Sequence, residues 1–151
     1  MNNIPRLAGP ADLSQVRAVV AAAYGKYTAR MEKAPAPVYR DYAEAIDHEL
    51  VWVIGDPIQG LISLVPAHDA LLIENIAVQP SSRGSGLGRR LMEFAEGQAM
   101  AREVRRLTLN TNEAMPENVS IYRHLGFSEV DRRTEDGYRR IYMEKTLQNA
   151  N

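Results

Sequence analysis

The sequence contains no cysteine, only two phenylalanines and one tryptophan, and no long hydrophobic run. Without cysteine the chain cannot form a disulfide framework, a thiolate nucleophile, or a zinc or iron–sulfur site with sulfur ligands. Its longest apolar stretch, residues 18–25, is far shorter than the roughly 20 residues that a membrane-spanning helix needs. The opening residues, MNNIPRLAGPADL, lack the basic and apolar regions of a secretory signal. We therefore expect a cytoplasmic protein that has no membrane partner.

An excess of charge of either sign is also missing. The 18 lysines and arginines nearly balance the 19 acidic residues, which gives a formal net charge of −1 and a sequence pI of about 6.3. This balance argues against a protein whose main task is to hold nucleic acid phosphates. The histidines, His48, His68 and His124, lie on separate predicted elements and lack the spacing of a metal site. We therefore expect neither a nucleic acid partner nor a metal.

The composition fits one globular domain. The chain has 151 residues, of which 45% are hydrophobic, and folding at this size buries roughly 70% of the surface of the unfolded chain. No repeat, low-complexity run or linker divides the sequence. We expect a single domain over residues 1–147 and a frayed C-terminal tail over residues 148–151.

Hydrophobic periodicity predicts a mixed α/β domain. Strands are expected over residues 3–7, 50–55, 59–65, 70–78, 107–111, 127–133 and 138–145. Helices are expected over residues 11–27, 38–48, 86–102 and 116–125. Near the centre of the chain strands alternate with helices, which indicates a mixed sheet of six to seven strands flanked by about four helices.

The most informative segment is residues 78–91, VQPSSRGSGLGRRL, which joins a buried strand to the strongest predicted helix. Alternating glycines let successive backbone amides turn inward, because no Cβ stands in the way. The helix N-terminus adds partial positive charge, so the segment can form a concave anion site that flanking arginines reinforce. The glycines are Gly84, Gly86 and Gly88, and the arginines are Arg83 and Arg89.

Three well-known motifs do not fit this loop. A nucleotide P-loop requires Lys-Ser/Thr after its last glycine, and the dinucleotide pattern G-x-G-x-x-G requires glycine or alanine where Arg89 stands. A nucleophile elbow is excluded because Ser85 lies directly between two glycines. Taken alone, the loop is either an anion site or a tight strand-to-helix turn that uses glycine for packing.

Two segments together carry a family resemblance. The loop over residues 83–88, which follows the strand sequence Ile-Ala-Val, resembles the acyl-CoA pyrophosphate loop of the GNAT superfamily of N-acetyltransferases. Downstream, Tyr122 with Gly126 and Phe127 is similar to the second signature of that family. The resemblance extends over nearly the whole chain. It implies a twisted mixed sheet that splays apart between its fourth and fifth strands, with the pantetheine arm of acetyl-CoA in the gap.

The resemblance also implies a set of cofactor contacts. Backbone amides of the loop would bind the pyrophosphate, and backbone groups of the preceding strand would pair with pantetheine. Relatives often carry a cofactor-binding asparagine where this chain has Met115, so either Asn118 or Asn112 would replace it. The implied contacts are Ile76, Ala77, Val78, Arg83, Gly84, Ser85, Gly86, Leu87, Gly88, Arg89 and Asn118.

Two residues are the catalytic candidates. The resemblance implies that Tyr122 is the general acid that protonates the CoA thiolate, although a helical tyrosine can also simply pack against a sheet. Glu74 is the candidate base, because a carboxylate embedded in the apolar run LLIENIAV calls for an explanation. Alternatively, Glu74 faces solvent or pairs with an arginine. Strand alternation places Asn75 on the opposite face, away from this role.

The resemblance implies an amine as acceptor, and we expect a primary amine of a small molecule. Tyr39 and Glu74 are the expected acceptor contacts, whereas the periodicity of Tyr24, Tyr27 and Tyr42 indicates packing. A protein N-terminus or a lysine is an alternative acceptor, and a non-catalytic acyl-CoA-binding or sensing domain is an alternative function. The resemblance also implies a homodimer.

Overall fold

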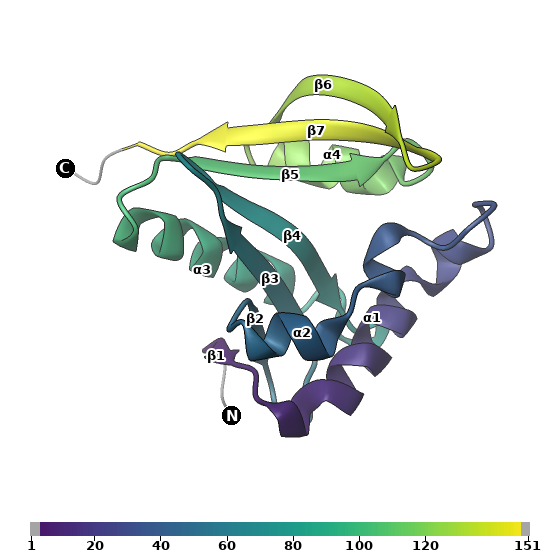
Figure 1. The fold of residues 1–151 in the computed structure, drawn as a ribbon, viewed down its shortest axis with the longest axis vertical. Helices are drawn as coiled ribbons and strands as arrows, with labels where there is room; N and C mark the ends of the chain where they lie inside the picture. Colours follow the sequence, from purple (N-terminus) through teal and green to yellow (C-terminus); the bar gives the residue numbers. More distant parts are fainter. Residues whose placement is uncertain (1–3, 149–151) are drawn as a thin grey trace.

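The computed structural model describes residues 4–148 as one seven-stranded sheet with four α-helices (Figure 1). The strand order is β1-β2-β3-β4-β5-β7-β6. The strands are β1 (Arg6–Leu7), β2 (Val51–Ile54), β3 (Gly60–Pro66), β4 (Leu71–Val78), β5 (Arg106–Asn112), β6 (Ser128–Glu135) and β7 (Tyr138–Thr146). The helices are α1 (Leu13–Thr28), α2 (Tyr42–Asp47), α3 (Leu87–Ala101) and α4 (Pro116–His124). The expected α/β class and mixed sheet are confirmed.

The sheet divides between β4 and β5. These two strands run parallel and pair only at Leu71 with Leu107 and at Leu72 with Thr108. β5 continues instead as the antiparallel partner of β7 along its whole length. Figure 1 shows β4 descending away from the β5–β7–β6 layer, so a wedge opens between the two parts of the sheet. The expected splay between the fourth and fifth strands is confirmed.

The two faces of the sheet are covered differently. α3 packs against β3, β4 and β5 through the buried side chains of Leu91, Ala95 and Ala99. Their spacing keeps them on one face of the helix. α1 packs on the other face against β3 and β4, with Val16 and Val20 fully buried. α3 therefore spans the division of the sheet, while α1 covers the part that ends at β4.

α2 is shorter than the helix expected over residues 38–48. A 3-10 helix over Ala36–Tyr39 comes first, and the extended backbone of Arg40 (φ −64°, ψ 137°) separates it from α2. Asp41 then caps α2, because its side chain accepts a hydrogen bond of 3.1 Å from the amide of Glu44. A short polar side chain at this position starts a new helix and ends the continuous periodicity.

The ends of the chain also differ from expectation. The strand expected over residues 3–7 is the two-residue β1, and Asn3 lies outside the described residues. Of the tail predicted over residues 148–151, only Gln148 is described, and it is exposed and outside β7. In the described part of the chain, the helices are too short or too polar to cross a membrane.

Candidate active site

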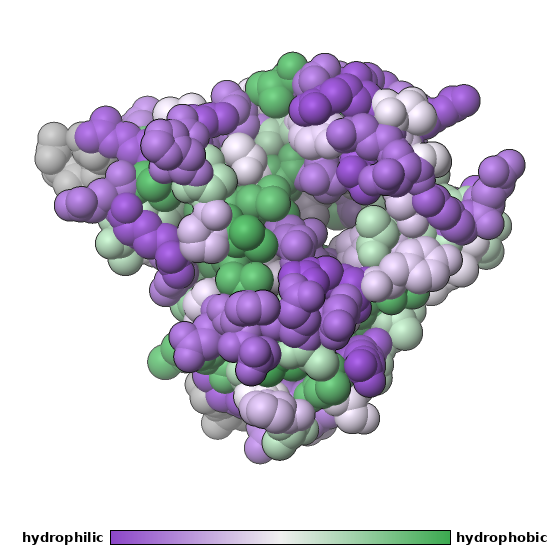
Figure 2. All heavy atoms as spheres, viewed as in Figure 1, coloured by the Kyte–Doolittle hydropathy of each residue, from purple (hydrophilic) through white to green (hydrophobic). Residues whose placement is uncertain are grey.

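Two cavities occupy the wedge and the space beside the glycine loop. The wedge cavity, of about 280 Å³, lies between β4, β5, β7 and residues 35–42. The loop cavity, of about 350 Å³, lies between α1, the end of β4, the start of α3, and α4. Figure 2 shows a hollow on this face of the molecule, below the β5–β7–β6 layer. Both cavities are lined by Tyr24, Ile76, Asn118 and Tyr122, so they meet at these side chains.

The glycine loop leaves backbone amides open at the start of α3. Gly84 and Gly86 have left-handed backbones, with φ of +82° and +85°, which glycine adopts without strain. The first helical hydrogen bond of α3 runs from the amide of Arg90 to the carbonyl of Gly86, so the amides of residues 87–89 precede it. A Cβ added at Gly88 would meet no atom within 4 Å. The loop is therefore open to a ligand, and tight internal packing does not explain its glycines.

Two side chains of the glycine loop form hydrogen bonds within the protein, so they stabilise the loop itself. Arg83 lines the loop cavity, but its Nη2 donates a hydrogen bond of 3.2 Å to the carbonyl of Ala23, which ties the loop to α1. The hydroxyl of Ser85 bonds to the carbonyl of Ser82. The expected contacts that line the loop cavity are Ile76, Ala77, Val78, Arg83, Gly88, Arg89 and Asn118. Those that do not line it are Gly84, Ser85, Gly86 and Leu87.

Tyr122 lies where the two cavities meet. Its ring packs edge-on against Phe127 at 5.9 Å between centroids, which holds the side chain in place. In the described part of the chain its hydroxyl forms no hydrogen bond with protein. Burial, and to a smaller degree the nearby Tyr27, raise the pKa of the phenol well above its usual 10.0. Tyr122 therefore holds a proton and a free donor at the junction.

Glu74 lies in a β-bulge of β4. The register with β3 shifts between Ser63 and Leu64, which leaves Glu74 without a partner and turns its side chain toward the wedge cavity. Its Oε1 accepts hydrogen bonds of 3.1 Å from the Ser63 hydroxyl and from Nε of Arg40. The pairing with an arginine, which the sequence left open, is thus present. Oε2 carries no hydrogen bond from the described residues, so one carboxylate oxygen remains available in the cavity.

The description "acetyltransferase (GNAT) domain" belongs to a family model that matches residues 47–129. The chain belongs to the acetyltransferase (GNAT) family. The resemblance stated from the sequence is thereby confirmed.

Among curated proteins, an N-alpha-acetyltransferase 80 from Mus musculus is 45% identical over 58 residues, and an IAA acetyltransferase from Azospirillum brasilense is 35% identical over 57 residues. Each match covers 38% of this chain, but only 17% and 37% of those proteins. The PaiA N-acetyltransferase of Thermoplasma acidophilum, solved in complex with coenzyme A, superposes with a TM-score of 0.73 at 17% identity. That match covers 95% of this chain and 98% of the other, and it shows that the fold is shared.

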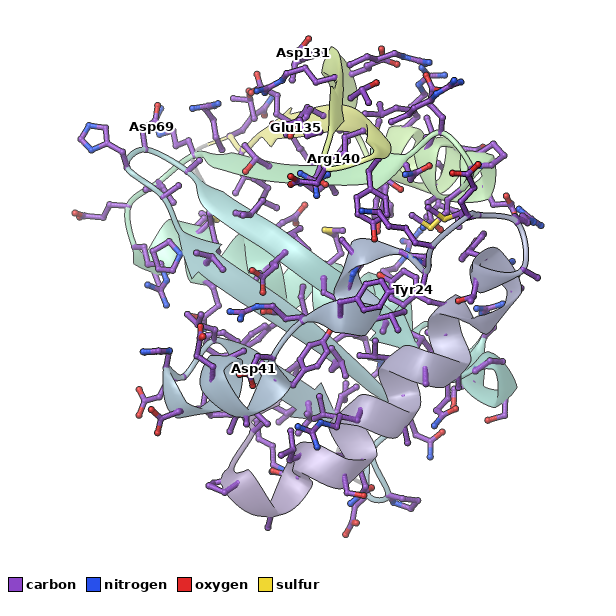
Figure 3. The ribbon with its side chains drawn as sticks, turned by 45° about the vertical axis from the view of Figure 1, so that its right-hand side comes forward. Tyr24, Asp41, Asp69, Asp131, Glu135 and Arg140 are labelled. Atoms are coloured by element: carbon purple, nitrogen blue, oxygen red, sulfur yellow. The ribbon has the colours of Figure 1, made fainter. Side chains whose placement is uncertain are left out.

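A buried network of hydrogen bonds lies next to the wedge cavity, and the sequence did not indicate it. The Tyr24 hydroxyl donates to Oδ1 of Asn75 at 2.6 Å, and Nδ2 of Asn75 donates to the Tyr42 hydroxyl at 2.9 Å. The Tyr42 hydroxyl donates in turn to the carbonyl of Pro37 at 2.6 Å. Figure 3 shows Tyr24 on α1, at the side of the sheet that carries the wedge. Asn75 lines the wedge cavity beside Glu74, so its exclusion by simple alternation was wrong, because the bulge interrupts the alternation.

Tyr39, the predicted acceptor contact, lies outside both cavities. Its side chain is 65% exposed, its hydroxyl accepts a hydrogen bond of 3.3 Å from the amide of Ala34, and it lines neither cavity. Tyr39 is the last residue of the 3-10 helix Ala36–Tyr39. Tyr138 and Arg140 of β7 line the wedge cavity instead. The two residues are two positions apart on one strand, which predicts that they share a face. Nothing in the sequence, however, indicated that β7 lies across the wedge from β4.

The two candidate asparagines have different places. Asn112 lines only the wedge cavity, and its Oδ1 accepts a hydrogen bond of 2.8 Å from the amide of Ala114, which shapes the turn after β5. Asn118 lies on α4 at the junction of the cavities, where its Nδ2 contacts Sδ of Met115 at 3.8 Å. The geometry thus favours Asn118 over Asn112 for a contact with the cofactor arm. Across residues 4–148, no group of three or more histidines, cysteines and acidic residues could hold a metal ion.

Proposed function

We propose that this GNAT chain transfers an acetyl group from acetyl-CoA to a primary amine of a small molecule. The observation that carries the proposal is the meeting of the two cavities at Tyr122. A thioester that arrives from the loop cavity and an amine that arrives from the wedge cavity would come together at this phenol. Acyl transfer needs such a junction, because the two reactants must be held in near-attack geometry.

The loop cavity fits acetyl-CoA. The free amides of residues 87–89 and the N-terminus of α3 suit a pyrophosphate, and Arg89 adds positive charge. Beyond Leu72, β4 has no strand partner on its β5 side, so its backbone can pair with the amides of the pantetheine arm as an added strand does. The PaiA structure with coenzyme A supports this choice of cofactor.

The chemistry follows from the groups at the junction. Oε2 of Glu74, directly or through a water molecule, accepts the proton that the amine loses as its nitrogen attacks the thioester carbon. The tetrahedral intermediate collapses with cleavage of the C–S bond. The departing thiolate takes the proton of the Tyr122 hydroxyl. Solvent then returns a proton to the phenolate, and Glu74 releases its proton to solvent. The products are an N-acetyl amide and CoA with a free thiol.

The closure of the wedge favours a small acceptor. The hydroxyl of Tyr138 donates a hydrogen bond of 2.6 Å to the carbonyl of Ala34, and Nζ of Lys33 bonds to the carbonyl of Asp136. These contacts join residues 29–40 to the β6–β7 hairpin across the opening. A polypeptide substrate would need a longer open groove. The partial match to an N-alpha-acetyltransferase makes a protein N-terminus the second candidate acceptor. A cytoplasmic location and a homodimer remain predictions from sequence.

The test is release of free thiol from acetyl-CoA with a panel of small amines and a peptide with a free N-terminus, against an amine-free control. We expect amine-dependent thiol release that is greatest for a small amine. Greater release with the peptide would favour the second candidate. Thermal stabilisation by CoA without turnover would instead support a non-catalytic acyl-CoA-binding domain, because ligand at 100 times its Kd adds about 2.7 kcal/mol. No shift with CoA would refute the cofactor assignment.

A further inference from the structure

The wedge cavity contains more positive than negative charge. Among the described residues, its charged lining consists of Arg40, Glu74 and Arg140. Arg40 and Glu74 form an ion pair at 3.1 Å and compensate each other. The excess positive charge is that of Arg140.

Arg140 forms one long ion pair, with Glu135 of β6. The nearest carboxylate oxygen, Oε1 of Glu135, lies 3.7 Å away, beyond hydrogen-bond distance, and it already accepts a hydrogen bond from the hydroxyl of Tyr142. The Arg140 side chain is 22% exposed, so solvent compensates it only in part. Figure 3 shows Arg140 on the β7 side of the wedge. A half-buried guanidinium in a cavity favours a planar anion that can accept its forked hydrogen bonds.

The position of Arg140 separates it from the reacting groups. Arg140 pairs in register with Asn112 on β5, whereas Glu74 projects from β4 on the other side of the division. The Tyr138 ring lies 5.5 Å from the guanidinium carbon and helps to orient it. A molecule that reaches both sides of the cavity would meet Glu74 at one end and Arg140 at the other.

A second observation points to a polar ligand in the same cavity. Thr111 is 6% exposed and lines the wedge cavity, and its Oγ1 has no hydrogen-bond partner. Among the described residues, it is the only side-chain nitrogen or oxygen with almost no exposed surface that lacks a partner. Such a group carries a desolvation cost that a bound hydrogen-bonding ligand would remove.

We propose that the acceptor is a small amino carboxylate, with its amine at Glu74 and Tyr122 and its carboxylate at Arg140. This inference rests on the proposed function and names the substrate class of that same site. A carboxylate is a planar anion, so its two oxygens match the forked donors of the Arg140 guanidinium. The Thr111 hydroxyl supplies a further hydrogen bond to the polar part of the bound molecule.

The experiment compares amino acids with their own carboxamides, which keep the amine and lose the negative charge. kcat/KM is measured for wild type, Arg140→Gln, Arg140→Lys and, as matched control, Arg139→Gln. Arg139 is the neighbouring arginine on β7, its side chain is 77% exposed, and it lines neither cavity. We expect wild type and Arg139→Gln to prefer the carboxylate by at least tenfold, Arg140→Gln to lose that preference, and Arg140→Lys to keep part of it.

The outcomes separate this inference from the function on which it rests. Equal turnover of carboxylates and carboxamides by wild type would overturn the inference and leave acetyl transfer standing, and so would an unchanged preference in Arg140→Gln. If no amine is turned over, the proposed function fails, and calorimetry on the CoA-loaded protein decides the inference. Binding of the amino acid to wild type and not to Arg140→Gln would support it, and equal binding to both would refute it. Arg140→Lys and thermal melting control for loss of folding.

Discussion

Replacement of Tyr122 by phenylalanine tests the chemistry most directly, because it removes one atom at the junction of the two cavities. The ring packs edge-on against Phe127, and phenylalanine keeps that contact. The hydroxyl forms no hydrogen bond with the described residues, so its loss leaves no protein group unpaired. We therefore expect the free energy of unfolding to change by less than about 0.5 kcal/mol, as for substitutions that break no packing or network.

The catalytic effect of the same change is expected to be large. A positioned general acid contributes roughly 100- to 10,000-fold to the rate, which is about 3–5 kcal/mol of activation free energy. The loss appears in kcat, while the Kd for CoA stays within about threefold, because the hydroxyl acts on the departing thiolate rather than on the bound cofactor. Burial raises the pKa of the phenol, so it stays protonated as pH rises through its usual value of 10.0. Ionisation of Tyr122 should therefore cause no alkaline decline of the wild-type kcat below that pH.

The assay is thiol release with the preferred amine, measured beside CoA calorimetry and a thermal melt. Tyr39→Phe serves as the matched control, because Tyr39 is exposed and lines neither cavity. A Tyr122→Phe enzyme whose kcat equals that of wild type would remove the acid assignment. A loss of kcat accompanied by a loss of CoA binding would show that the hydroxyl binds the cofactor instead.

Three further predictions follow from the loop, the cavity and the surface. Gly86→Ala places a Cβ on a backbone with φ of +85°, so CoA calorimetry should show at least tenfold weaker binding. The control Gly97→Ala, in the middle of α3, should bind CoA as wild type does. Retained binding in Gly86→Ala would contradict the loop assignment. Thr111→Val removes the unpartnered hydroxyl, so it should raise the melting temperature by roughly 2–4 °C and also raise KM for the acceptor. A lower melting temperature would mean that the hydroxyl is paired. A hydrogen bond from Arg30 lowers the pKa of Glu117 from 4.5 to about 2. The ionised Glu117 carboxylate therefore stabilises the fold fully above pH 4.5, and this stabilisation is lost as pH falls toward 2. Glu117→Gln should accordingly flatten the acid side of the melting profile, and an identical profile would refute that contribution.

Local patterns predicted most of the elements, because each needs only its own residues. The apolar run of β4 and the 3.6-residue period of α3 identify both elements without knowledge of their neighbours. α2 is the exception: the stripe expected over residues 38–48 is real, but Asp41 offers its side chain to the amide of Glu44 and divides the segment. One hydrogen bond there outweighs a weak periodic signal.

The residues of the candidate site also fall into two groups, those that local sequence predicts and those that depend on how distant strands pair. The glycine loop and Tyr122 could be predicted, since each belongs to a contiguous signature whose geometry is local. Arg140 and Tyr138 could not, because they reach the wedge only after β7 pairs with β5. Glu74 lies between these cases: its carboxylate stands out in an apolar strand, but its partnership with Arg40 depends on the bulge and on the extended backbone before α2.

The wedge exists because the two parts of the sheet are held together on one face and left free on the other. α3 packs against both β4 and β5, so the strands can separate beyond Leu72 without losing their shared core. On the opposite face α1 packs against β3 and β4, and contacts such as Tyr138 with Ala34 close the opening toward β7. The groups proposed for acyl transfer therefore lie on β4 and α4, and the groups proposed to select the acceptor lie on β7 and residues 29–40. Substitutions in the second set should change the acceptor and leave CoA binding intact.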